Sequence, residues 1–251
     1  MLYFDKKARL YPLDSQALHP YNVERWSPVT KSRMITNGRQ YFAVPKSELN
    51  PPPPTAIADL EELQSYFFSE QAVEAALAVA PELLGRDDSG SLIHGTTGAR
   101  AFTEALGRVA AGPGDSFLDI GCGCGLPVLV ASRVLGRAHG VDVVPSVIRF
   151  AREAASRFHS QATFAEADIK EVRMETYDIV YIAATTFSDE LRASIQEKLA
   201  ELRAGAIAIS LTYSFSCPHL VLVDSFESPF AWWKTSAPSP HRFYIHMRRA
   251  E

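Results

Sequence analysis

The sequence lacks the long apolar runs of a membrane protein. In the first third of the chain the longest apolar stretch, AVEAALAVA at 72–80, carries Glu74 and ends at Pro81. It falls far short of the roughly 20 residues needed to cross a bilayer. The N-terminus, MLYFDKKARLYPL, has no apolar core before a small-residue cleavage site, so the pattern indicates no secretory signal peptide. We therefore expect a cytoplasmic protein without membrane attachment.

Strong charge and abundant cysteine are also absent. The net charge is -4, from 25 basic and 29 acidic residues, which gives no global attraction to nucleic acid or to acidic membrane. Only three cysteines occur, and Cys122 and Cys124 are too close in sequence for an ordinary disulfide, which fits a reducing compartment. No spacing of histidines, cysteines or carboxylates resembles a zinc site or a facial triad. We expect no metal.

Three segments follow one another along the 251 residues. Residues 1–55 show no sustained period and end in LNPPPPT, so they are expected to form an arm or boundary. Residues 56–110 have the apolar spacing of helices, with a break near Ser69 and a further helix over 99–110. Residues 111–251 are expected to form the main domain, because a chain of this length accommodates one large domain and a small appendage.

From residue 116 onward, strand-like and helical segments alternate. Strands are predicted at 116–120, 138–143, 162–167, 177–184 and 206–212, and helices at 126–136, 145–158 and 188–204. This order predicts an α/β fold with a doubly wound parallel sheet and right-handed crossovers. Two later strand-like runs, 219–226 and 241–249, predict an antiparallel pair at one edge. The result is a Rossmann-like sheet of seven strands with a mostly helical N-terminal extension.

The stretch LDIGCGCGLPV at 118–128 joins the first strand to the following helix. Without side chains at Gly121, Gly123 and Gly125, the backbone can turn tightly and let a ligand approach closely. The two intervening cysteines have no further ligands for a metal and lack the spacing of a redox pair. They are interpreted as small fillers, and the loop as a ligand-binding loop.

Acidic residues end three consecutive predicted strands. Asp119 precedes the glycine loop, Asp142 follows 21 residues after Gly121, and Asp168 ends the third strand. Ligands of open α/β sheets bind at the carboxyl ends of the strands, where such an acid can hold both hydroxyls of a ribose. Asp168 can accept from an adenine amino group while Ile169 packs on the ring, although a helix N-cap is an alternative. Together these residues favour an adenosine pocket.

The D-x-G-x-G-x-G order departs from a dinucleotide fingerprint, whose third glycine would fall at Leu126. It resembles the first motif of class I S-adenosylmethionine-dependent methyltransferases, and the resemblance extends over roughly residues 90–250. It implies S-adenosyl-L-methionine as cofactor, with the glycine loop beside its methionine part, Asp142 at the ribose and Asp168 at the adenine. The cofactor-binding residues implied are Thr96, Asp119, Gly121, Cys122, Gly123, Gly125, Asp142, Val143, Asp168, Ile169 and Ala183.

The methyl acceptor must be inferred from the end of the fourth strand. No Asn/Asp-Pro-Pro-aromatic box, common in enzymes that methylate nucleobases or glutamine, follows YDIVYIAATTF at 177–187. The segment 177–210 resembles instead the non-SET lysine methyltransferases of the disruptor-of-telomeric-silencing type. The ending DSFESPFAWWKTSAPSPHRFYIHMRR resembles theirs, and HGTTG at 94–98 stands at the place of their Tyr-Gly-Glu-Thr loop. The resemblance implies a protein lysine as acceptor.

Several residues depart from that family. Ala183 and Ala184 replace two asparagines, Thr185 replaces the first phenylalanine, and Thr96 replaces the loop glutamate, whereas Phe187 keeps its type. A lysine must lose its proton before it attacks, and aromatic walls favour the neutral amine. Phe187, Tyr213 and Phe215 are the candidate catalytic walls, ahead of Trp232 and Trp233, although core packing is an alternative for each.

Two other functions stay open. A small-molecule methyltransferase would use the first 110 residues as a lid, and a catalytically idle cofactor-binding scaffold would explain the departures from the acceptor motif. A nucleosomal substrate fits poorly, because the chain has no long basic tail to hold DNA phosphates.

Overall fold

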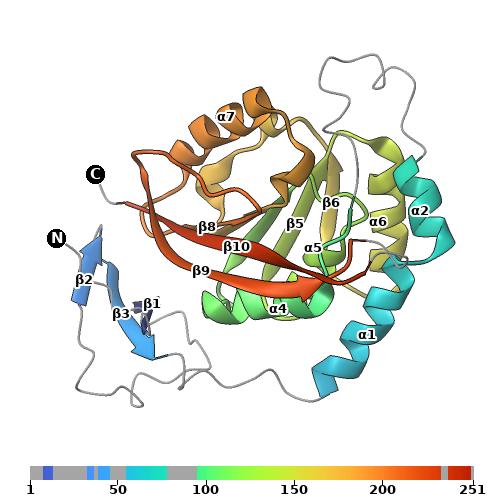
Figure 1. The fold of residues 1–251 in the computed structure, drawn as a ribbon, viewed down its shortest axis with the longest axis horizontal. Coiled ribbons are helices and arrows are strands. Elements are labelled where there is room, and N and C mark those ends of the chain that lie inside the picture. Colours follow the sequence, from blue (N-terminus) through green and yellow to red (C-terminus); the bar gives the residue numbers. More distant parts are fainter. Residues whose placement is uncertain are drawn as a thin grey trace.

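The alternating pattern after residue 115 folds as predicted. The computed structural model describes residues 8–13, 33–36, 39–45, 55–77, 95–232 and 237–249. In this part of the chain, seven strands form one sheet in the order β6-β5-β4-β7-β8-β10-β9 (Figure 1). The strands are β4 (Ser116–Ile120), β5 (Arg137–Asp142), β6 (Thr163–Glu166), β7 (Ile179–Ile182), β8 (Ile207–Leu211), β9 (Leu220–Phe230) and β10 (Ser239–Arg248). The first five are parallel, and β10 runs antiparallel to both β8 and β9. The predicted fold class is confirmed.

Helices cover both faces of this sheet. One face packs against α4 (Ala99–Arg108), α5 (Leu126–Ala131) and α6 (Pro145–Arg157), and α1 (Thr55–Phe67) and α2 (Glu70–Leu77) lie outside these. The other face packs against α7 (Asp189–Lys198) and the short 3-10 turns around it. Alternation along β4 explains the division, because Phe117 joins the first core and Leu118 the second. The break predicted near Ser69 separates α1 from α2.

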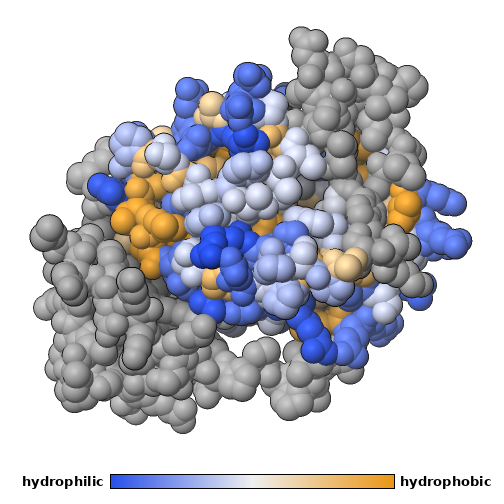
Figure 2. All heavy atoms as spheres, viewed as in Figure 1, coloured by the Kyte–Doolittle hydropathy of each residue, from blue (hydrophilic) through white to orange (hydrophobic). Residues whose placement is uncertain are grey.

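Helix α7 begins as its sequence indicates. Ser188 is the N-cap, and its hydroxyl accepts a hydrogen bond from Leu191 N at 3.2 Å. Asp189 and Glu190 follow in the first turn, where negative charge is favourable. The buried Ile195 anchors the helix to the sheet, and Figure 2 shows hydrophilic side chains over its outer face. Helix α7 therefore carries the chain from the end of β7 to β8 with one solvated side.

Helix α4 receives its cap from another helix. Its N-cap residue is Gly98, which has no side chain to accept from the first N–H groups. Gln64 of α1 supplies the acceptor, because its Oε1 accepts from Ala99 N at 2.6 Å. An ion pair between Arg100 and Glu61 lies beside this bond. The helical extension is thus joined to the main domain at the start of α4.

Two segments differ from the predictions. Helix α5 ends at Ala131 rather than near residue 136, because Ser132 Oγ donates to Leu129 O at 2.8 Å and the next N–H groups tighten the turn. Residues 1–55 were expected to form an arm, whereas the backbone places β1 (Ala8–Leu13), β2 (Arg33–Thr36) and β3 (Arg39–Pro45) in an antiparallel sheet. Residues 78–94, within the predicted helical segment 56–110, lie outside the described residues.

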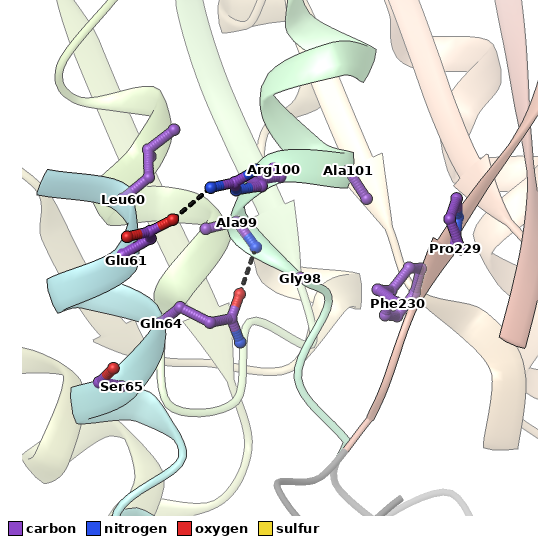
Figure 3. Close-up of a pocket in the computed structure, with 10 residues that line it drawn as sticks. All are labelled: Leu60, Glu61, Gln64, Ser65, Gly98, Ala99, Arg100, Ala101, Pro229 and Phe230. Atoms are coloured by element: carbon purple, nitrogen blue, oxygen red, sulfur yellow. Dashed lines mark hydrogen bonds and ion pairs between the residues drawn. The ribbon is translucent and has the colours of Figure 1, made fainter. Parts of the chain in front are cut away.

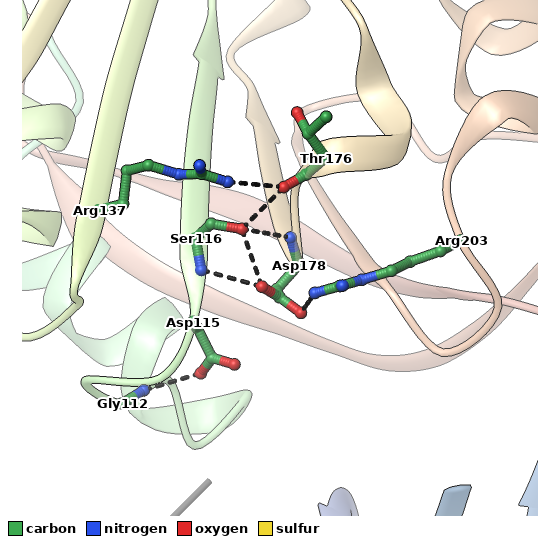
Figure 4. A network of polar contacts seen from close by, with 7 residues as sticks. All are labelled: Gly112, Asp115, Ser116, Arg137, Thr176, Asp178 and Arg203. Atoms are coloured by element: carbon green, nitrogen blue, oxygen red, sulfur yellow. Dashed lines mark hydrogen bonds and ion pairs between the residues drawn. The ribbon is translucent and has the colours of Figure 1, made fainter. Parts of the chain in front are cut away.

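A polar network ties together the amino ends of the strands (Figure 4). Asp178 Oδ2 accepts from Ser116 N at 3.0 Å and from Ser116 Oγ at 2.8 Å, and Arg203 pairs with the other carboxylate oxygen. Arg137 donates to Thr176 O at 2.8 Å. These groups satisfy backbone ends at the edge opposite the glycine loop, so we assign them to the fold.

The buried His246 makes stability depend on pH. Burial lowers its pKa to about 4, and Ser214 Oγ lies 3.0 Å from its Nε2. In the unfolded chain a histidine titrates near pH 6.5, so the unfolded state binds more protons between these values. We expect the free energy of unfolding to fall by about 3 kcal/mol between pH 6.5 and 4 through this residue. Urea unfolding of the wild type and of His246→Gln across this range checks it, and equal pH slopes would contradict it.

Candidate functional site

The glycine loop lies across the carboxyl ends of β4 and β5. The N–H groups of Gly121 and Cys122 both donate to Val141 O at 2.9 Å, so the loop turns directly over β5. Gly123 has a φ of 51°, in the left-handed region, and its N–H donates to Asp142 Oδ2 at 2.9 Å. This closes the loop with its backbone toward the carboxyl edge of the sheet, where a ligand can approach it.

The Asp142 carboxylate organises this edge. Its second oxygen, Oδ1, accepts from Val144 N at 2.9 Å, so both oxygens hold backbone near the end of β5. The side chain is partly exposed. Burial is the larger effect and raises the pKa of Asp142, while the backbone hydrogen bonds lower it. A carboxylate fixed in this way is suited to accept from two adjacent hydroxyls.

Two polar side chains stand side by side within the apolar sheet. Asp119 of β4 is the direct neighbour of Tyr181 of β7, and both are essentially buried. The Tyr181 hydroxyl lies 2.7 Å from Thr97 Oγ1, a contact between residues 84 positions apart. Burial raises the pKa of Asp119 well above its usual range, and the charge of Asp142 raises it further. A buried carboxylate of this kind is stabilised by a cationic ligand.

These groups line one pocket. It is formed by the glycine loop, the ends of β4 and β7, and the segment 95–97, with residues Gly95, Thr96, Thr97, Asp119, Gly121, Cys122, Gly125, Leu126, Pro127, Tyr181 and Ala183. The enclosed part measures about 20 Å³, room for one water molecule. A larger ligand therefore requires the surrounding side chains to shift. Six residues predicted from the sequence line this pocket: Thr96, Asp119, Gly121, Cys122, Gly125 and Ala183.

The segment 95–98 is held from two sides. Thr96 N donates to Trp232 O at 3.2 Å, and a Cβ at Gly95 would lie 3.0 Å from the Trp232 ring. The Tyr181 hydroxyl holds Thr97 from the sheet. Trp232, which follows β9, and Tyr181 of β7 thus hold this segment beside the pocket that it shares with the glycine loop. His94 and Trp233 lie outside the described residues.

The two loop cysteines pack against neighbouring elements of the fold. Cys124 Sγ lies 3.6 Å from Ala72 O of α2, and Cys122 Sγ packs where a Cβ at Gly140 would come within 2.8 Å of it. Both thiols are free and buried, whereas Cys217 is partly exposed. These contacts support their interpretation as fillers.

This packing predicts the reactivity of the thiols. Burial raises the pKa of Cys124 to about 12 and that of Cys122 well above its usual value, so neither forms the reactive thiolate. In the native protein, iodoacetamide at pH 8 is expected to alkylate Cys217 first, and in denaturant all three cysteines. Mass spectrometry of the intact chain and of its peptides measures this. Rapid native alkylation of Cys122 or Cys124 would show that the loop is open.

The residues predicted to contact adenine, Asp168 and Ile169, follow the end of β6. Asp168 is the N-cap of the turn Ile169–Glu171, and its Oδ1 accepts from Lys170 N at 2.9 Å. The N-cap alternative is therefore correct for one carboxylate oxygen. The Ile169 side chain is buried, and Val143, the residue after Asp142, is partly exposed. Their contacts with adenine remain predictions.

The three candidate wall residues do not share one place. Phe187 lies on the glycine loop, since a Cβ at Gly121 would come 2.8 Å from its Cζ. Tyr213 is 40% exposed, and the Arg192 guanidinium lies 4.2 Å from its ring centroid. Phe215 is instead buried against His246, with ring centroids 5.5 Å apart, in the core beneath α7. The structure therefore brings Phe187 to the pocket, places Tyr213 near it at the surface, and leaves Phe215 in the core.

A second, larger pocket of about 420 Å³ lies between α1, the start of α4 and the end of β9 (Figure 3). Its apolar wall includes Leu60 and Phe230, and its mouth carries the Glu61–Arg100 ion pair. Gly98 borders it and leads directly into the segment 95–97 of the first pocket. The two pockets are thus neighbours on either side of this segment.

Within the described ranges, no cluster of three or more histidine, cysteine, aspartate or glutamate side chains is arranged to hold a metal ion. The helices of those ranges include none that is long and apolar enough to span a bilayer.

Five residues of the pocket were not predicted as site residues from the sequence: Gly95, Thr97, Leu126, Pro127 and Tyr181. Tyr181 offered a weak signal, because it places a hydroxyl in the middle of the apolar strand IVYI. Thr97 is adjacent to the predicted Thr96, and only the fold shows which hydroxyl meets Tyr181.

Comparisons with known proteins agree with this geometry. Residues 117–205 match the family model described as "Methyltransferase domain". Ribosomal protein L11 methyltransferases from Ralstonia pickettii (strain 12J) and Cupriavidus taiwanensis are 35% and 34% identical to this chain, each over 94 residues. Each match covers 37% of this chain and 30% of the relative, so the chain matches less than a third of the length of these curated relatives.

A solved RNA methyltransferase from Salinibacter ruber, in complex with S-adenosyl-L-homocysteine, has a similar fold. The TM-score is 0.51 at 17% sequence identity, and the match covers 62% of this chain and 94% of that one. The similarity supports the fold assignment.

The glycine loop on a sheet of this strand order, together with the family match over residues 117–205, indicates a methyltransferase domain. The family match and the similar fold of a methyltransferase solved with S-adenosyl-L-homocysteine support S-adenosyl-L-methionine as the cofactor. The residues present fit this cofactor: the Asp142 carboxylate lies beside the glycine loop, and the buried Asp119 lines the pocket, where a cation would stabilise it. The contact of Asp142 with the ribose stays a prediction.

Proposed function

We propose that this chain transfers a methyl group from S-adenosyl-L-methionine to the side-chain amino group of a protein lysine, as a divergent relative of the non-SET lysine methyltransferases. The observation that carries the proposal is the position of Phe187, whose ring lies on Gly121 of the glycine loop. An aromatic ring at this place excludes water from the point where the cofactor methyl and the acceptor meet.

Arg192 fixes this aromatic wall. Its Nη1 donates to the Phe187 carbonyl oxygen, its Nη2 pairs with Asp189, and its guanidinium lies 4.2 Å from the Tyr213 ring centroid. The guanidinium also places a positive charge beside the backbone of Phe187. A nearby positive charge and a water-poor wall both lower the pKa of an incoming lysine, so both favour the neutral amine that reacts.

The bound cofactor supplies a methyl group already activated on a sulfonium. The nitrogen lone pair forms the new C–N bond as the C–S bond breaks, and the bonding pair stays on sulfur. The lysine proton is lost to solvent before attack, so the chain needs to orient the amine and exclude water rather than to supply a strong base. Ala183 and Ala184, at the end of β7, carry no acidic or basic group.

Two findings support a protein acceptor. The relatives that align with this chain over 94 residues are named as methyltransferases of a ribosomal protein. Residues 95–97, within the segment that stands at the place of the Tyr-Gly-Glu-Thr loop of the non-SET enzymes, also line the pocket together with the glycine loop.

The proposal is tested by methyl transfer into an extract. The purified chain is incubated with tritiated S-adenosyl-L-methionine and a cell extract, and proteins are separated from small molecules and hydrolysed. We expect tritium in methyllysine of a small number of proteins, and none with the Asp142→Ala variant. Label found only in small molecules would favour a small-molecule methyltransferase. Absence of label from a chain that binds the cofactor would favour an idle scaffold, and either result would refute the lysine proposal.

A further inference from the structure

Two threonine hydroxyls meet where β7 and β8 end. Thr185 lies in the 3-10 turn Ala184–Thr186 that follows β7, and Thr212 directly follows β8. Their Oγ1 atoms are 3.2 Å apart. Both side chains are partly exposed, so the pair lies at the surface of the carboxyl edge rather than in the core.

The backbone at Thr212 is strained. Tyr213 N donates to Leu211 O at 2.9 Å, and the residue enclosed by this i to i+2 bond, Thr212, has a φ of 71°. This is the classic γ-turn, which is rare and strained, and a β-branched residue at positive φ is an outlier. The turn is held by Thr212 N, which donates to Arg242 O at 2.9 Å, and by Ser210 Oγ, which donates to Tyr213 O at 2.6 Å.

Core packing does not account for this strain. Thr212 is partly exposed, and the next side chain, Tyr213, is 40% exposed. Glycine or asparagine would occupy such a backbone position at lower cost. Strained backbone that neighbouring contacts hold in place is concentrated at functional sites. What the threonine adds to the turn is a hydroxyl beside that of Thr185.

The hydroxyl pair lies beside the methyl-transfer site. Ala183 lines the cofactor pocket, and the turn that contains Thr185 leads from it to Phe187, whose ring lies on Gly121. Ala183 and Ala184 contribute no side-chain hydrogen-bonding group at this point. Along the chain, Thr185 therefore lies between Ala183 of the pocket and Phe187 of the aromatic wall, and the Thr212 hydroxyl lies beside that of Thr185.

We infer that Thr185 and Thr212 bind the acceptor amine and orient its lone pair toward the cofactor methyl. The inference rests on the proposed lysine acceptor. Each hydroxyl donates one hydrogen bond and can accept two, so the pair keeps free acceptor capacity after one hydroxyl donates to the other. Uncharged oxygens can accept from the N–H groups of a neutral amine and raise its pKa less than a carboxylate would. The pair therefore suits an amine that must stay deprotonated.

The test uses analogues that extend from the cofactor site into the acceptor site. In the probe, the sulfur of S-adenosyl-L-homocysteine is replaced by a nitrogen that carries a propylamine arm, and in the control the arm ends in a methyl group. Calorimetry gives the Kd of both and of S-adenosyl-L-homocysteine itself. For the wild type we expect the amine arm to bind about tenfold more tightly than the methyl arm, the effect of one to two hydrogen bonds.

Thr185→Val and Thr212→Gly each remove one hydroxyl. Both are expected to reduce the amine preference to about twofold or less, with the Kd of S-adenosyl-L-homocysteine unchanged. Thr212→Gly is also expected to raise the Tm, because glycine relaxes the γ-turn, so loss of binding cannot be attributed to unfolding. Thr185→Ser and Thr212→Ser, which keep the hydroxyls, are expected to keep the preference.

Each other outcome is decisive. If the amine preference survives in Thr185→Val and Thr212→Gly, the inference is wrong, whereas the proposed amino acceptor stands. If the wild type binds S-adenosyl-L-homocysteine but shows no preference for the amine arm, the amino acceptor itself is wrong and the inference falls with it.

Discussion

Replacing Asp142 with alanine is expected to weaken binding of S-adenosyl-L-methionine by about 100-fold or more. The wild-type carboxylate is fixed by Gly123 N and Val144 N, each at 2.9 Å, and remains partly exposed. Alanine removes the two charge-assisted hydrogen bonds that we propose between this carboxylate and the ribose hydroxyls. It also releases Gly123 N, so the glycine loop loses its attachment to the end of β5.

Calorimetry with S-adenosyl-L-methionine and S-adenosyl-L-homocysteine measures this loss. Glu153→Ala, at an exposed position of the neighbouring helix α6, removes a carboxylate elsewhere and should bind both ligands normally. Circular dichroism should show an intact fold for both variants. A Kd for Asp142→Ala within a few-fold of the wild type would mean that Asp142 does not contact the ribose.

Gly123→Val is expected to abolish detectable cofactor binding while the sheet stays folded. Gly123 has a φ of 51°, where a β-branched residue is strongly disfavoured. The strain amounts to about 1–2 kcal/mol, which a domain of this size tolerates with a Tm lowered by a few degrees. The loop can relieve the strain only by moving Gly123 N away from Asp142, and this movement alters the surface that faces the cofactor.

Gly107→Val provides a matched control. A Cβ at Gly107, in α4, would meet no atom within 4 Å, so the same substitution adds a side chain in open space. This variant should keep the wild-type Kd at a modest cost in helix stability. Normal cofactor affinity in Gly123→Val would refute the role assigned to the loop.

The sequence was most informative where one local pattern decides the structure. Strand β4, the glycine loop and α5 follow from an apolar run, three glycines and Pro127 within 16 residues. The same holds for Asp142, because the end of a strand and the start of a helix bracket it. These features depend on neighbouring residues alone, so the fold and the position of the glycine loop and Asp142 could be predicted from the sequence.

Features that depend on distant contacts were not predictable. The Thr97–Tyr181 hydrogen bond joins residues 84 apart, and the cap of α4 comes from Gln64, 35 residues before Ala99. Phe215 shows the same limit: its place after β8 suggested the pocket mouth, but the chain turns at Thr212 and buries its ring against His246. Only tertiary packing decides between those two positions.

The contact between Thr97 and Tyr181 crosses the boundary of the segment that matches the family model. The segment recognisable by family, residues 117–205, contains Tyr181 but not Thr97, and it ends before β8 begins at Ile207. Cut at those limits, the chain would leave the buried Tyr181 hydroxyl without its partner, at a cost of about 1–3 kcal/mol, and would open one side of the cofactor pocket. The segment that matches the family model is therefore smaller than the part of the chain that must fold together to complete the pocket.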